Sequence, residues 1–249
     1  ISNNAEDGLR TAGSVHNVIS GNLVKSNTQN AFYLSVSSYD TITSNTLKLN
    51  GAAGIYIWGG TGNVIRRNTF DTNTTGGIRI LNTGTKNTIE NNDIQFETSG
   101  IFLWGGSDAN IIVNNRIVSC TNGIVLNALA ADTNIYSCTI AFNTIRASKA
   151  DGLLIDYGSN DMHVVGNKIT GSDSRGISVT DPAVASADPG WDYPNVYEFN
   201  NLIDNDSVAS FYTSGGTNTF SDLLDYARGV IQPGAGYRNT SNETFAITV

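Results

Sequence analysis

The chain has 249 residues and carries 14 Lys and Arg against 22 Asp and Glu, a formal net charge of −8 at pH 7. This acidic balance argues against a nucleic-acid partner and against an anionic membrane surface, because both need a basic patch on the protein. No stretch approaches the roughly 20 apolar residues of a membrane-spanning helix, so we expect no membrane insertion. With 39% apolar residues in short regular runs and only 14% charged residues, the composition favours an all-β protein full of turns over a disordered one.

A short motif recurs along the chain, in which a small residue is followed by an apolar, a variable and an apolar residue. Successive copies are 23, 23, 23, 23, 29 and 24 residues apart, and they begin at Ala31, Gly54, Gly77, Gly100, Gly123, Gly152 and Gly176. A second motif keeps nearly the same period and places an Asn between apolar positions, at Asn22, Asn45, Asn68, Asn92, Asn115, Asn143, Asn167 and Asn200. Two independent motifs in one register indicate a structural repeat.

A unit of about 23 residues suits either a leucine-rich repeat or one coil of a β-solenoid. Leucine-rich repeats need fixed Leu positions and a helical segment, whereas here Ile, Val, Leu and Phe alternate at period two between Gly, Asn, Thr and Ser turns, which is typical of strands. We therefore predict an all-β solenoid of roughly eight coils with three short strands per coil. The repeated Asn is expected at a tight bend, in a left-handed backbone conformation, and stacked into a hydrogen-bonded ladder.

The segments "NVIRRNTF", "GGIRI", "NTIENNDI" and "GIFLWGG" resemble the right-handed parallel β-helix repeat of the pectin-lyase-like superfamily, which includes NosD-like and carbohydrate-active proteins. The resemblance covers residues 1–205 and implies a right-handed parallel β-helix. It implies no single reaction, because this fold carries lyases, hydrolases, epimerases, adhesins and phage tailspikes. In many of these enzymes the strand that contains "GIYI" here forms the floor of the substrate groove.

The two ends of the chain carry their own signals. The first residues, "ISNNAEDGLRTAGS", resemble the second half of a coil that nothing covers, so we expect the chain to be a mature portion or a piece of something larger, or to abut a partner, for example in a trimer. Residues 206–249 are expected to form a cap and tail of the same domain, with a short helix over residues 221–229. The tail "GYRNTSNETFAITV" weakly resembles the endings of phage tail proteins.

Alternation within each "GIYI" strand sends two columns of side chains outward. Trp58 and Trp104 lie two coils apart in one column, about 9–10 Å on the surface. Aromatic platforms with an Arg between them suit a polysaccharide and its carboxylates. A protein contact, or burial under long turns, would also account for the pattern, but the family resemblance favours a sugar. The candidate substrate-binding residues are Tyr33, Tyr56, Trp58, Arg79, Phe102, Trp104 and Asn127.

Acid–base chemistry is expected near the same face. Asp156 lies in an outward column and Asp181 follows the next strand, so the two carboxylates are expected about one rung apart. Two carboxylates at that distance can share the acid, base or nucleophile roles at a glycosidic bond. Asp151 and Arg175 hold equivalent places on successive coils and are further catalytic candidates, although a structural ion pair explains them more simply. For each residue, ordinary surface or turn chemistry is the competing interpretation.

Metal and cofactor chemistry has little support. No His, Cys, Asp and Glu cluster has metal-ligand spacing, so we expect no cofactor, with a structural Ca²⁺ held by turn carboxylates left open. The expected function is an extracellular, cell-surface or virion-surface protein that binds a polysaccharide, with its cleavage by a hydrolase or lyase reaction left open. The alternative is a non-enzymatic structural or adhesive module, such as a tailspike shaft, that uses the aromatic face for protein contacts.

Overall fold

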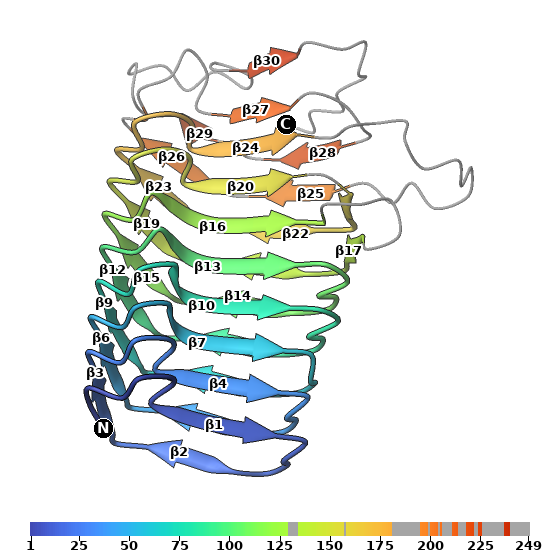
Figure 1. The fold of residues 1–249 in the computed structure, drawn as a ribbon. Helices are drawn as coiled ribbons and strands as arrows, with labels where there is room; N and C mark the ends of the chain where they lie inside the picture. The colour runs from blue at the N-terminus through green and yellow to red at the C-terminus, as the bar shows by residue number, and fades with distance from the viewer. Residues whose placement is uncertain are drawn as a thin grey trace.

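The computed structural model is a stack of β-coils, drawn in Figure 1. It describes residues 1–128, 134–156, 158–180, 195–198, 200–203, 205, 211–213, 218–221, 224–225 and 237–239. Every described regular element is a strand, and strands one coil apart pair in parallel. The predicted parallel solenoid is confirmed, and the chain turns through three sheets in each coil.

The three sheets run the length of the stack. The ten-stranded sheet contains β1 (Leu9–Ala12), β4 (Phe32–Ser35), β7 (Ala53–Trp58), β10 (Gly76–Leu81), β13 (Ser99–Trp104), β16 (Asn122–Asn127), β20 (Leu153–Asp156), β24 (Ile177–Thr180), β27 (Phe211–Thr213) and β30 (Tyr237–Asn239). The β2 sheet contains β2 (Val18–Ser20), β5 (Thr41–Thr43), β8 (Val64–Arg66), β11 (Thr88–Glu90), β14 (Ile111–Val113), β18 (Thr139–Ala141), β22 (His163–Val165), β25 (Asn195–Glu198) and β28 (Asn218–Ser221). The β3 sheet contains β3 (Leu23–Lys25), β6 (Thr46–Lys48), β9 (Thr69–Asp71), β12 (Asp93–Gln95), β15 (Arg116–Val118), β19 (Thr144–Arg146), β23 (Lys168–Thr170), β26 (Asn201–Ile203) and β29 (Leu224–Asp225).

A small two-stranded sheet, β17 (Ile135–Tyr136) and β21 (Ser159–Asn160), adds to this frame. The expected helix over residues 221–229 is wrong at Leu224–Asp225, which extend the β3 sheet by pairing with β26. In the tail, Tyr237–Asn239 form a strand that pairs with β27.

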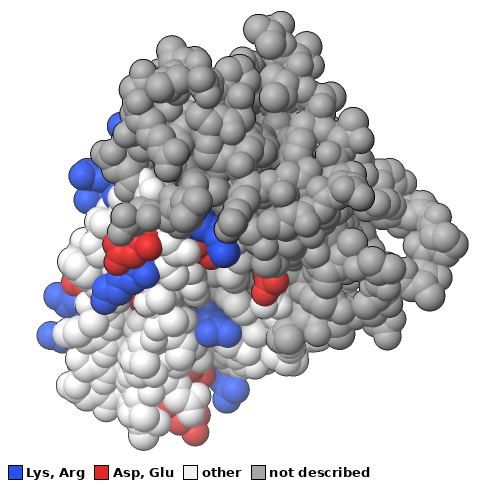
Figure 2. Space-filling model, turned by 90° about the horizontal axis from the view of Figure 1, so that it is seen from above, with Lys and Arg blue, Asp and Glu red and all other residues white. Residues whose placement is uncertain are grey.

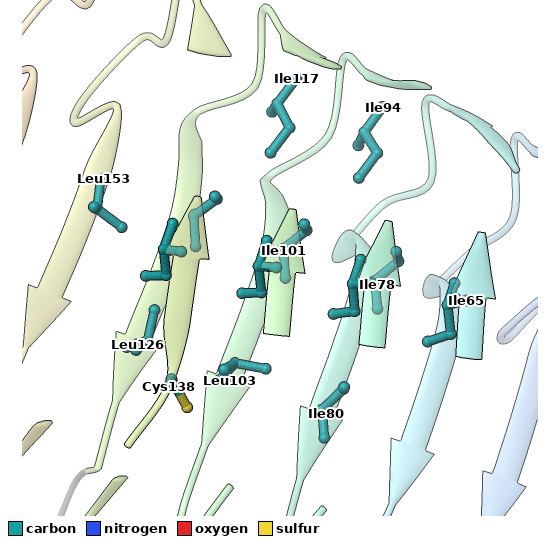
Figure 3. Packing of buried hydrophobic residues seen from close by; sticks show 14 of the residues in the cluster. Ile65, Ile78, Ile80, Ile94, Ile101, Leu103, Ile117, Leu126, Cys138 and Leu153 are labelled. Atoms are coloured by element: carbon teal, nitrogen blue, oxygen red, sulfur yellow. The ribbon is translucent and has the colours of Figure 1, made fainter. Parts of the chain in front are cut away.

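The interior is a set of apolar columns, one residue per coil. Ile55, Ile78, Ile101 and Ile124 are in register in the ten-stranded sheet and have no exposed surface. Figure 3 shows their neighbours Ile80, Leu103 and Leu126 packed in the same interior. No single coil could bury these side chains, so the core exists only because coils stack.

The predicted Asn ladder is present at the bend between the β2 and β3 sheets. Its members, Asn22, Asn45, Asn68, Asn92, Asn115, Asn143, Asn167 and Asn200, are linked one to the next. Asn68 Oδ1, for example, accepts from the backbone N–H of Asn45 at 2.9 Å and from its Nδ2 at 3.0 Å. Each ladder Asn therefore accepts hydrogen bonds from the Asn of the previous coil and donates hydrogen bonds to the Asn of the next coil.

The expected left-handed conformation of the ladder Asn is wrong. The residue just before it turns instead, as at Ser44 (φ 56°), Arg67 (φ 54°) and Phe142 (φ 54°). A turn at that residue directs the next side chain inward, where both its amide and its backbone N–H meet the following coil.

Two further ladders occupy the other bends, and the sequence interpretation missed both. One links Asn4, Asn27, Asn50, Asn73 and Glu97, and the other links Asn17, Asp40, Asn63, Asn87 and Asn110. The two cysteines, Cys120 and Cys138, follow in these columns as free buried thiols, and burial raises the pKa of each to about 12.

Asn68→Ala is expected to destabilise the fold by about 2–4 kcal/mol. It leaves the buried N–H of Asn45 without a partner and removes the hydrogen bonds that the Asn68 side chain makes with Asn45 Nδ2, Asn92 Oδ1 and the Ile42 carbonyl. Urea unfolding measures the loss. Asn91→Gly is the matched control, because Asn91 is an exposed neighbour with φ 55° and Gly adopts that conformation without strain. Equal unfolding midpoints for Asn68→Ala and the wild type would contradict the structural role of the ladder.

Glu97 makes stability depend on pH. Burial raises its pKa from the ordinary 4.5 to about 8, and its Oε2 is buried without a hydrogen bond. A carboxyl whose pKa is raised by folding retains its proton in the folded state, so stability falls as pH rises from about 4.5 to about 8. Glu97→Gln keeps an acceptor for Asn73 without the charge, and its unfolding free energy is expected to exceed that of the wild type above pH 8 and to match it below pH 4.5. Parallel pH profiles for the two proteins would contradict this origin.

Candidate functional site

The outward side of the ten-stranded sheet brings the predicted binding residues together. Pairing places Tyr33, Tyr56, Arg79, Phe102, Val125 and Leu154 in one column. The adjoining column holds Ser35, Trp58, Leu81, Trp104, Asn127 and Asp156. We call these twelve residues, on β4 to β20, the outer face.

The aromatic side chains of the outer face are partly exposed, and three of them lie against one another. The ring centroids of Tyr33 and Tyr56 lie 5.3 Å apart, and those of Tyr56 and Trp58 lie 6.4 Å apart with planes 4° from parallel. Partial burial raises the pKa of the Tyr56 hydroxyl. No described segment crosses in front of β4, β7, β10 and β13 in Figure 1. The aromatics are therefore not buried under any described turn.

Two apolar residues of the outer face are nearly covered. Leu81 is 6% exposed and Val125 is 4% exposed, although both point away from the core. Leu81 lies in register between Trp58 and Trp104. A residue on a bare sheet surface would be open to solvent, so other groups of the molecule cover both side chains. The outer face from β4 to β13 is thus mainly apolar, with partly exposed aromatic rings.

Arg79 is the cation within this layer. Its Cζ lies 4.6 Å from the centroid of the Phe102 ring, a cation–π contact. Its Nη1 donates to the carbonyl of Thr75 at 3.4 Å, and its Nε is buried without a partner. Partial burial lowers its pKa, but a guanidinium stays protonated at neutral pH. Arg10 makes the corresponding contact with Tyr33, at 4.5 Å, which the sequence interpretation missed.

The outer face becomes polar toward β16 and β20. Asn127 and Asp156 are in register, and Asn127 Nδ2 donates to Asp156 Oδ2 at 3.0 Å. Ser159 Oγ donates to the carbonyl of Asp156 at 2.8 Å, which ties the end of β20 to the small β17–β21 sheet. The small β17–β21 sheet therefore lies beside Asp156, which carries the one carboxylate of the outer face.

The other catalytic candidates are placed differently. Asp181 lies outside the described residues. Asp151 is 8% exposed and its Oδ1 accepts from the backbone N–H of Arg175 at 3.0 Å, while the Arg175 guanidinium donates to Ser178 Oγ at 3.0 Å. The Asp151 carboxylate thus binds the main-chain N–H of Arg175, and this hydrogen bond joins two successive coils.

The rest of the described surface is sparsely charged. Figure 2, a view along the helix axis, shows acidic and basic side chains interspersed among uncharged ones. His163 lies 3.3 Å from a carboxylate oxygen of Glu198 on the β2 sheet, and His16 stacks on Tyr39, both away from the outer face. Within the described residues, no three His, Cys, Asp or Glu side chains gather as metal ligands, and no helix could cross a bilayer.

This architecture is that of a right-handed parallel β-helix with one aromatic sheet surface. A sequence-family model, described as the right handed beta helix region, matches residues 1–70 and 40–223, so the chain belongs to that family. Comparison with curated proteins finds no match.

Several solved structures share the fold. A double mutant of the periplasmic alginate epimerase AlgG superimposes with a TM-score of 0.54 at 14% identity, over 98% of this chain and 75% of the other. The A-module of the Azotobacter vinelandii mannuronan C-5 epimerase AlgE6 gives 0.58 at 14%, over 92% and 70%. The Dettilon tailspike protein gives 0.50 at 16%, over 87% and 59%. At such identities the likeness establishes the fold alone.

Proposed function

We propose that this protein binds a polysaccharide laid along the helix axis over the outer face. The observation that carries the proposal is the set of partly exposed aromatic side chains, in register on β4, β7 and β13, with Arg79 and Leu81 on the β10 rung between them. Rungs about 4.8 Å apart give Trp58 and Trp104 a separation of about 10 Å. This spacing is close to the length of two sugar rings in an extended chain, so the two Trp side chains suit the apolar faces of every second ring.

The electrostatics of the outer face agree with this ligand. Arg79 lies between the aromatic residues Tyr56 and Phe102 and offers donors to an acid group carried by the sugar chain. The neighbours named as alginate and mannuronan epimerases, and the tailspike, support a polysaccharide as the kind of ligand. The periplasmic epimerase and the tailspike support a location outside the cytoplasm, in the extracellular space or on a cell or virion surface.

We further propose that Asp156 makes the polar end of the outer face a reaction centre, for hydrolysis or elimination at a glycosidic bond. Support comes from its place in the same column as the aromatic platform and from the amide of Asn127, which orients the carboxylate. A partner carboxylate one rung away would complete an acid–base pair. Asp181 stays our candidate for that role. Asp151 and Arg175 are weaker catalytic candidates because their contacts join coils.

Trp58→Ala and Trp104→Ala are each expected to weaken polysaccharide binding about tenfold or more, since each removes a large buried contact area. A glycan array identifies the ligand, and titration calorimetry gives the affinities. Tyr39→Asn is the control, because Tyr39 is an exposed aromatic outside the outer face with φ 59°. Unchanged array binding by both Trp variants would contradict the proposal.

Asp156→Asn is expected to lower the release of reducing ends or unsaturated uronides by about 10²-fold or more, as for loss of a general acid or base. Binding and the unfolding midpoint should be retained, because an Asn at this position still offers an acceptor to Asn127. Equal product release by the variant and the wild type would remove Asp156 from the chemistry.

The alternative function is a structural or adhesive module whose outer face contacts protein. The partly exposed Tyr33, Tyr56, Trp58, Phe102 and Trp104 also favour it, because aromatic residues are enriched in protein interfaces. The oligomeric state separates the two functions. If Trp58→Ala dissociates an oligomer of the wild type and leaves glycan binding unchanged, the outer face is a protein interface.

A further inference from the structure

Charge is rare on the outer face. Over its six strands, β4 to β20, the only charged residues among the twelve are Arg79 and Asp156. They lie three rungs apart, about 14 Å along the helix axis. All the other members are aromatic, aliphatic, or uncharged and polar. One rung beyond the outer face, on β1, Arg10 is in register with Tyr33 and is paired with Asp7.

Arg79 has no acidic partner in the described part of the chain. The ion pairs there join Arg10 to Asp7, Arg66 to Glu90, Arg116 to Asp93 and His163 to Glu198. The guanidinium of Arg79 is partly desolvated against Phe102, and its one hydrogen bond, to the Thr75 carbonyl, is long at 3.4 Å. Since a buried cation costs free energy unless it is paired, a ligand acid group would restore what burial removed.

A polysaccharide with an acid group on every ring does not match this pattern. From Tyr33 to Leu154 the outer face spans five rungs, about 24 Å, which is long enough for several sugar rings. A polyuronate would place one carboxylate at Arg79 and the remainder over Tyr56, Trp58, Trp104 and Leu154 or beside Asp156. Those carboxylates would lose water without gaining a partner, and one would face a like charge.

We infer that the ligand is a polysaccharide built mainly of neutral sugars, with one acid group per several rings, and that this group binds at Arg79. The inference rests on the proposed function and specifies the substrate class. The neutral rings present C–H faces to the aromatic side chains, and the acid group takes a charge-assisted hydrogen bond from Arg79. Away from Arg79, uncharged rings pass Asp156 without repulsion, which leaves hydrolysis as the reaction proposed there, because elimination needs a uronate at the reacting ring.

The test compares three classes of probe: polymannuronate with an acid on every ring, gellan and xanthan with an acid only on some rings, and neutral cello-oligosaccharides and dextran. The sparsely acidic class is expected to bind most tightly. Chemical reduction of its carboxyl groups is expected to weaken binding about tenfold, the value of a hydrogen bond to a charged group. High salt should weaken binding only to the level of the reduced form.

Variants of Arg79 sharpen the comparison. Arg79→Gln is expected to bind the acidic and the reduced forms equally, and Arg79→Lys to keep part of the preference. Arg116→Gln is the matched control, because Arg116 is paired with Asp93 on the β3 sheet, and it should behave as the wild type.

The outcomes separate the two levels of proposal. Tightest binding of polymannuronate, or an acid preference that survives in Arg79→Gln, overturns the inference while the proposed function stands. Tightest binding of the neutral class does the same. No binding of any class by the wild type overturns the proposed function and the inference together.

Discussion

The structure depends on one constraint: each coil must repeat the register of the coil before it. The main-chain hydrogen bonds of the three sheets impose that register, and rows of inward side-chain amides reinforce it at the bends. Asn suits these rows because one small side chain carries both a donor and an acceptor, so a copy on the next coil satisfies it. Where the row departs from Asn, polar atoms are left unpaired, as at Asp40 Oδ2, Glu97 Oε2, Ser148 Oγ and Ser172 Oγ. The fold tolerates these positions because the neighbouring rows and sheets remain intact.

The same register creates the outer face. A period of two that sends Ile55 and Ile57 into the core sends Tyr56 and Trp58 outward, and stacking converts single outward residues into continuous columns. The side chains of a binding surface are thereby held on rigid strands before any ligand arrives, which lowers the ordering cost of binding. The repeat also explains how chemistry can change along the axis. A substitution in one coil alters one rung, so aromatic platform, cation and carboxylate can follow one another without changing the fold.

Much of this could be predicted from the sequence because period and alternation are local signals. They indicated the coils, the inward Ile columns, both outward columns and the first Asn ladder. The other ladders were missed because their members change identity along the column, from Asn to Asp40, Glu97 and Cys120. The left-handed residue was misplaced by one position because a bend signal in sequence does not say which residue turns. Contacts of the candidate site were beyond reach for another reason. These contacts depend on side-chain rotamers and on insertions such as β17–β21, which no repeat pattern encodes. Examples are the burial of Leu81, the hydrogen bond between Asn127 and Asp156, and the hydrogen bond that the Asp151 carboxylate accepts from the Arg175 backbone.

The central claim is that the register of the coils builds a polysaccharide-binding surface on the ten-stranded sheet. A crystal structure of the protein with a bound oligosaccharide tests it most directly. The account predicts sugar rings along the helix axis over Trp58 and Trp104, with an acid group against the Arg79 guanidinium. An oligosaccharide seated on the β2 or β3 sheet, or an outer face closed by a second protomer, would contradict it.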